Sequence, residues 1–135
     1  MNKYRSIKSV LFIGRFFVTI PVILIMILTP ILSLLVVINY LGTSYVTVAI
    51  IVGAILSQFT GWIWWSFTIP IWRVWAYSNT RKEDWQKLTD KAIQGLLIWP
   101  ENHKYEKTEI RTSKQKEFIQ EVYKYLKENN IESNT

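Results

Sequence analysis

The stretch that decides the fold runs from residue 16 to residue 72 and reads FFVTIPVILIMILTPILSLLVVINYLGTSYVTVAIIVGAILSQFTGWIWWSFTIPIW. Its 57 residues include no Asp, Glu, Lys, Arg or His, and all 26 acidic and basic residues of the 135-residue chain lie outside it. Helices of a soluble domain need a polar face toward water. A charge-free stretch of this length is therefore typical of a protein embedded in a lipid bilayer.

The stretch is long enough for two membrane-spanning helices. A helix crosses the bilayer core with about 20 apolar residues, and residues 16–38 and 46–67 each reach that length. The intervening NYLGTSY, residues 39–45, holds Gly42 and small polar residues typical of a turn. We predict a mainly α membrane protein with a two-helix transmembrane hairpin over residues 16–72. The alternative is a single span followed by a buried soluble helix.

Basic residues flank the predicted hairpin at both of its ends. Residues 1–15 carry four Lys or Arg and no acid, the second span is followed by Arg73, Arg81, Lys82 and Lys87, and the turn has none. The positive-inside rule then places both chain ends in the cytoplasm and the turn outside. The apolar run is too long for a signal peptide, and no A-x-A-type cleavage site follows it. We therefore expect an uncleaved anchor in the cytoplasmic (inner) membrane of a prokaryote.

The segment 1–15 has two faces if it is helical. One face carries apolar or small residues, namely Ile7, Val10, Leu11 and Gly14. The other carries Arg5, Lys8, Phe12 and Arg15. Two interpretations remain open: an amphipathic helix lying on an anionic lipid surface, or a plain continuation of the first span with Arg15 reaching toward the membrane interface.

A stripe of small residues runs along the second span. Ala49, Gly53, Ser57 and Gly61 follow one another at intervals of four, so they stack on one face of a helix. Small side chains at this spacing let another helix approach closely in lipid. The partner helix is either the first span of the same chain, or a second copy or another membrane protein. Gln58 is expected to hydrogen-bond to that partner helix or to a backbone carbonyl.

Five of the seven tryptophans gather where the second span ends. They are Trp62, Trp64, Trp65, Trp72 and Trp75. Tryptophan concentrates at membrane–water interfaces because its ring is apolar while its N–H needs a polar partner. We predict an interfacial belt formed with Arg15 and Arg73, rather than a cage around a ligand. Pro70 predicts a kink, after which residues 71–77 would turn along the membrane surface.

The rest of the chain, residues 73–135, is predicted to be a small cytoplasmic helical tail. Thr80 and Glu83 have the spacing of a capping box, which starts a helix over about 81–94. A second helix is predicted over 114–128, capped by Thr112 with Gln115. Between them, residues 96–110 could form a short β-hairpin. A domain this small has a marginal core by itself, so we expect it to need docking on the membrane or a partner.

The tail also offers a candidate partner surface, which comprises Trp99, Lys104, Lys107, Arg111 and Lys114. It could contact a protein or anionic lipid, although a simple solvated face is the plainer interpretation. From Arg73 onward there are 12 basic and 10 acidic residues, and this near balance argues against nucleic acid as a partner.

The composition excludes several kinds of chemistry. There is no cysteine and one histidine, His103, which rules out disulfides, cysteine-ligated zinc or iron–sulfur clusters, and haem held by two histidines. No phosphate-binding glycine loop or nucleophile-elbow motif occurs. We therefore predict no catalytic residue, no metal site and no cofactor.

These features predict a small non-enzymatic integral membrane protein that acts as an accessory, scaffolding or assembly subunit of a larger membrane complex. Its partners would be the lipid bilayer and another integral membrane protein or a second copy of itself. The alternative is a homo-oligomeric pore or membrane-permeabilising protein, which resembles holins in size and hairpin layout. A third class, an enzyme or cofactor protein that uses the aromatic cluster, has the least support.

Overall fold

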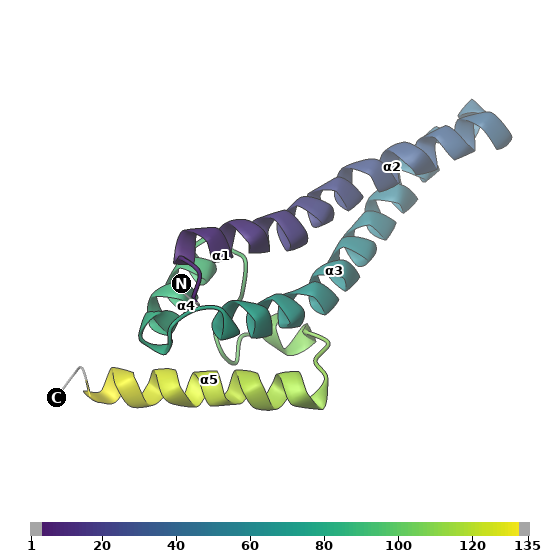
Figure 1. Cartoon of the computed structure of the whole chain (residues 1–135). Helices are drawn as coiled ribbons and strands as arrows, with labels where there is room; N and C mark the ends of the chain where they lie inside the picture. The colour runs from purple at the N-terminus through teal and green to yellow at the C-terminus, as the bar shows by residue number, and fades with distance from the viewer. Residues whose placement is uncertain (1–3, 133–135) are drawn as a thin grey trace.

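The computed structural model describes residues 4–132, and within them all regular structure is helical. Three helices lie in the apolar part and two in the tail, joined by short helical turns (Figure 1). The elements are α1 (Ile7–Gly14), η1 (Arg15–Thr19), α2 (Ile20–Tyr40), η2 (Thr43–Tyr45), α3 (Val46–Ser78), η3 (Lys82–Asp84), α4 (Trp85–Gln94), η4 (Glu106–Thr108) and α5 (Ser113–Glu132).

Two helices are long and apolar enough to cross a membrane: Ile7–Tyr40 and Thr43–Ser78. The α2 part of the first buries none of its residues, although it is almost wholly apolar. A soluble monomer rarely exposes a contiguous apolar patch of this size. Figure 1 shows α2 and α3 running side by side, with the turn between them at the far end from α1, α4 and α5. This arrangement indicates association with a membrane.

The N-terminal segment continues the first long helix instead of lying apart from it. One π-helical turn, η1, joins α1 to α2. The apolar face of α1 packs on the protein, because Val10 and Gly14 are buried and the Trp72 indole donates a hydrogen bond to the Val10 carbonyl at 3.3 Å. A Cβ atom on Gly14 would lie 2.5 Å from Nε1 of the Trp72 ring, so this close approach favours glycine. Of the two interpretations of this segment, the structure agrees with the one in which α1 continues the first span.

Helix α3 passes through Pro70 without interruption and ends 11 residues later than we predicted, at Ser78. Figure 1 shows it curving between the part beside α2 and the part beside α5. A proline has no N–H, so the carbonyl four residues earlier lacks its helical donor. Here that carbonyl, on Ser66, accepts a hydrogen bond from the Ile110 N–H at 2.9 Å. Residues 71–77 continue α3, and the tail folds around most of them.

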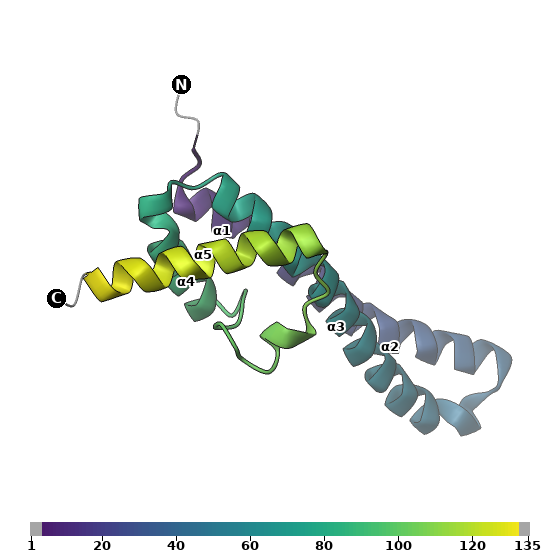
Figure 2. The ribbon, with the colours of Figure 1, turned by 90° about the horizontal axis from the view of Figure 1, so that it is seen from below.

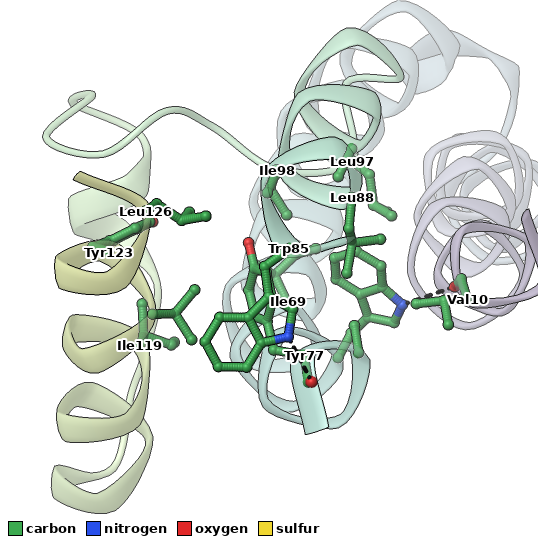
Figure 3. Packing of buried hydrophobic residues seen from close by; sticks show 14 of the residues in the cluster. Val10, Ile69, Tyr77, Trp85, Leu88, Leu97, Ile98, Ile119, Tyr123 and Leu126 are labelled. Atoms are coloured by element: carbon green, nitrogen blue, oxygen red, sulfur yellow. Dashed lines mark hydrogen bonds between the residues drawn. The ribbon is translucent and has the colours of Figure 1, made fainter. Parts of the chain in front are cut away.

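The tail packs around the C-terminal half of α3 (Figure 2). Its core takes residues from every α-helix except α2, for example Val10 from α1, Tyr77 from α3 and Ile119 from α5. Figure 3 shows Trp85 at its centre, where the indole N–H donates to the Tyr77 carbonyl at 3.0 Å. The tail thus completes its core with α1 and α3.

The segment between α4 and α5 contains no strand within the described residues, so the short β-hairpin that we considered for residues 96–110 is not formed. Leu96 and Asn102 adopt positive φ angles of 53° and 66°, which a strand does not allow. Pro100 has no N–H to give to a ladder. The segment instead closes on itself through turn bonds such as His103 N–H to the Pro100 carbonyl at 3.1 Å.

Candidate functional site

The small-residue stripe lies between α3 and α2. Ala49, Gly53, Ser57 and Gly61 are all buried. The Ser33 hydroxyl of α2 lies 3.2 Å from the Ala49 carbonyl, and a Cβ atom on Gly53 would lie 3.0 Å from the Pro30 Cα. Of the two partners that the sequence left open, the structure places the first span of the same chain against this stripe.

Gln58 follows Ser57 but lies on the outer surface of α3, where it is exposed. Its amide has no hydrogen-bond partner among residues 4–132, so the bond expected to another helix or a carbonyl of this chain is not made. The amide borders a hollow of about 200 Å³, which we call the Gln58 cleft. The cleft lies where the α2–α3 pair meets the tail, and its other lining residues are Val22, Met26, Gly61, Trp62, Trp65, Leu96 and Trp99.

An aromatic cluster forms one side of this junction. The Trp62 ring contacts Tyr105 at 5.1 Å between centroids, and Tyr105 contacts Trp99 at 5.1 Å. Trp99 also stacks on His103 at 4.8 Å, so the single histidine is a packing residue here. The Lys104 ammonium lies 4.9 Å from the Tyr105 ring centroid. These contacts tie the loop after α4 to the middle of α3.

The five tryptophans of the predicted belt differ in exposure. Trp62 and Trp64 are partly exposed, Trp65 is half-buried, and Trp72 is buried beneath α1. Trp75 is half-buried with the Arg5 guanidinium 5.6 Å from its ring centroid. The two arginines expected at the membrane interface also differ in exposure, since Arg15 is exposed but Arg73 is not.

Arg73 is completely buried, contrary to the interfacial position that we expected. Its Nη2 lies 2.8 Å from Glu109 Oε1 and also donates to the Trp99 carbonyl at 3.1 Å. Its Nη1 donates to the Tyr123 hydroxyl at 2.6 Å. The ion pair and these hydrogen bonds replace most of the water that a buried guanidinium loses, and Nε is left without a hydrogen-bond partner among the described residues. Arg73 therefore joins α3 to the loop and to α5.

Glu109 connects this pair to a second one. Its Oε2 accepts a hydrogen bond from Arg111 Nη2 at 2.8 Å, and the same guanidinium also pairs with Glu106. Burial alone would lower the pKa of Arg111, but its hydrogen bonds to Glu109 and Glu106 outweigh burial and raise that pKa. Burial, opposed by the charge of Arg73, raises the pKa of Tyr123 to about 12. The four charged groups, which we call the Arg73 network, have no net charge.

Only part of the candidate partner surface on the tail is exposed in the structure. Lys104, Lys107 and Lys114 are exposed as expected. Arg111 instead has both of its partners within the chain, and Trp99 is half-buried in the aromatic cluster. Sequence reasoning missed the network because Arg73 and Glu109 are 36 residues apart. The only local signal was that Glu106 and Glu109 lie close in sequence to Arg111.

Among residues 4–132, no group of three or more His, Asp or Glu side chains is arranged to hold a metal ion. Comparison with known protein families, curated proteins and solved structures finds no match to this chain. The function must therefore be argued from the Gln58 cleft, the Arg73 network and the apolar surface.

Proposed function

We propose that this chain is a small, non-enzymatic integral membrane protein of a prokaryotic inner membrane, and that it serves as an accessory, scaffolding or assembly subunit of a larger membrane complex. The partner would be another integral membrane protein that binds at the Gln58 cleft. The observation that carries the proposal is the Gln58 amide, which lies exposed on an apolar helix without a hydrogen-bond partner among the described residues.

An amide in this position is costly in lipid. Moving an unbonded amide from water into hydrocarbon costs on the order of 4–8 kcal/mol. A polar side chain on a neighbouring membrane helix removes that cost, and hydrogen bonds between membrane helices are worth about 0.6–2 kcal/mol. Gln58 is therefore a natural contact for a partner helix lying against α3.

Leu96 also indicates that the Gln58 cleft is a binding surface. Its side chain is 75% exposed and its φ angle is 53°, a conformation usually left to glycine at the end of a helix. An exposed leucine in a strained conformation is a reason to look for a binding partner. Because Leu96 lines the Gln58 cleft together with Trp62, one partner could contact both the span and the tail.

The proposed topology has two membrane spans with both ends in the cytoplasm. It is supported by the basic residues at the ends and their absence from the turn. It is also supported by the position of the α2–α3 turn, which lies far from both α1 and α5 (Figure 1). With this topology the exposed Lys104, Lys107 and Lys114 face the cytoplasm, where they could contact a second region of the partner.

The Arg73 network explains how a membrane contact could be transmitted to the tail. It fixes Glu109 and Tyr123 to α3, and the Ile110–Ser66 hydrogen bond fixes the loop beside them. A partner helix that binds beside Gln58 would therefore set the position of the tail as well. This rigid connection suits a scaffold or an assembly factor.

The test is purification from native membranes in mild detergent, with mass spectrometry of what co-purifies, for the wild type and Gln58→Leu. We expect a defined membrane protein with the wild type and at least a fivefold loss of it with Gln58→Leu, because one interhelical hydrogen bond of about 1 kcal/mol is removed. Phe59→Leu is the matched control, since Phe59 is 66% exposed on another face of α3. A wild-type monomer with no partner would refute the proposal.

The pore alternative makes a different prediction about the same residue. Because the chain has no cysteine, Gln58→Cys provides a single crosslinking site. Disulfide-linked homodimers at this position, together with loss of membrane potential on expression, would favour the homo-oligomeric pore over the accessory subunit. An intact membrane potential would eliminate it.

A further inference from the structure

A second hollow lies on the face of α3 opposite the Arg73 network. It has a volume of about 440 Å³ and lies between α3 and the first long helix. Ile13 and Phe17 line it from the first helix, and Trp64, Thr68, Ile71 and Trp75 line it from α3. At intervals of three or four, the α3 residues form one continuous row. We call this hollow the Trp75 groove.

The enclosed part of any occupant must be apolar. The Thr68 hydroxyl already donates to the Trp64 carbonyl at 2.8 Å, and the Trp72 indole N–H in the wall is bonded to the Val10 carbonyl. The lining therefore offers apolar surface to a ligand. A polar small molecule would lose its hydration here without new hydrogen bonds.

The groove is open to the apolar surface of the helices and has the length of a lipid chain. Phe17 and Ile71 on its rim are 62% and 59% exposed. From Trp64 to Trp75 an α-helix rises roughly 16 Å, which is close to half of the roughly 30 Å hydrocarbon core. One acyl chain of one leaflet would match this length.

One end of the groove is basic. The Arg5 guanidinium lies over the Trp75 ring, which lines the groove, at 5.6 Å. Arg5 is exposed, and it takes no part in an ion pair among residues 4–132. The Trp75 indole N–H likewise has no acceptor within the described chain. An anion at this end would meet the positive charge of Arg5 and one free donor.

We propose that the Trp75 groove binds one anionic phospholipid, with an acyl chain along Ile13, Thr68 and Ile71 and the phosphate group beside Arg5 and Trp75. A second copy of the chain is a poorer occupant, because its own first 15 residues carry four basic groups and no acid. The site is independent of the Gln58 cleft and stands whether or not a protein partner binds there.

The experiment is native mass spectrometry of delipidated full-length protein, titrated with phosphatidylglycerol or with phosphatidylcholine of the same chain length. The expected result is one retained lipid per chain and about a fivefold preference for phosphatidylglycerol, the contribution of one basic residue near anionic lipid. Arg5→Glu should abolish the preference but leave chain binding. Thr68→Trp, which fills the groove, should reduce the binding of both lipids at least fivefold.

Two matched variants distinguish binding at the groove from effects of overall charge and of an added apolar side chain elsewhere. Arg81→Glu makes the same charge change at an exposed position of the tail. Ile55→Trp adds the same side chain at an exposed position of α3 away from the groove. Both should bind lipid like the wild type, and thermal unfolding in detergent should show that all four variants are folded.

Three outcomes would overturn the proposal. The first is equal retention of the two lipids by the wild type. The second is unchanged lipid binding by a folded Thr68→Trp variant. The third is a homodimer that Thr68→Trp dissociates, since this would make a second copy the occupant of the groove. A preserved phosphatidylglycerol preference in Arg5→Glu would specifically reject the headgroup position.

Discussion

At the residue scale, Arg73 shows how a charge at the end of an apolar stretch can be misread. By sequence alone, the first cation after 57 uncharged residues belongs at a membrane interface. In the structure it is buried, because Glu109, Tyr123 and the Trp99 carbonyl come to it from distant parts of the chain. These partners are far from Arg73 in sequence, so no local pattern could predict the contacts.

Replacing Arg73 should destabilise the tail strongly. Arg73→Met leaves Glu109 buried with only one of its two cations, and breaking a buried ion pair costs about 3–5 kcal/mol. We expect the lower end of this range, because Arg111 still neutralises Glu109. Thermal unfolding in detergent measures the change. The control is Lys124→Met, whose exposed pair with Glu128 should contribute less than about 1 kcal/mol.

The double variant Arg73→Met/Glu109→Gln separates pairing from burial. It also removes the buried carboxylate that has lost one of its two cations, so it should be more stable than Arg73→Met alone if the ion pair is the source of the effect. A double variant as unstable as the sum of the two single variants would mean that Arg73 acts mainly through packing and its bonds to Tyr123 and Trp99.

At the element scale, the stripe on α3 could be predicted from the sequence because it depends only on the spacing of residues within one helix. Four small residues at intervals of four define one helix face, and that face is the one that α2 covers. The two predicted helix caps show that such a local pattern predicts one helix start and not the other. Thr112 and Gln115 form the expected reciprocal bonds at the start of α5, at 2.9 and 3.3 Å. Thr80 instead donates back to the Ala76 carbonyl at 2.9 Å, because α3 extends almost to it.

The two glycines of the stripe should differ in their tolerance of a methyl group. A Cβ atom on Gly53 would lie 3.0 Å from the Pro30 Cα, a backbone atom that cannot move aside, whereas one on Gly61 would make an ordinary contact with Met26 at 3.5 Å. Gly53→Ala should cost about 1–3 kcal/mol through overpacking. Gly61→Ala should be neutral or stabilise by up to about 1 kcal/mol, because alanine is the better helix former.

Thermal unfolding of both variants in the same detergent measures this difference. Equal stability of Gly53→Ala and Gly61→Ala would show that α2 does not pack as closely on α3 as the structure has it. A stability loss confined to Gly53→Ala would support the intramolecular contact and leave the Gln58 cleft as the surface for another membrane protein.

At the scale of the whole molecule, the sequence predicted the apolar part better than the tail. Absence of charge over a long stretch is a property of composition, and it predicts long apolar helices whatever their contacts. The tail depends instead on which apolar residues meet across the chain. Residues 71–77 looked interfacial because tryptophan and tyrosine suit both a membrane surface and a core. Their burial follows from α4 and α5 packing around them.

The tail should not fold by itself. Its core includes Val10 of α1, Val18 of η1, and Ile69 and Trp72 of α3, so a fragment of residues 79–135 would lack one wall. Domains below about 70–80 residues rarely have stability to spare. We expect this fragment to show little helix by circular dichroism and no cooperative thermal transition, whereas the full chain in detergent should show both. A cooperatively unfolding fragment would mean that α4 and α5 form an independent domain, and that the membrane helices only anchor it.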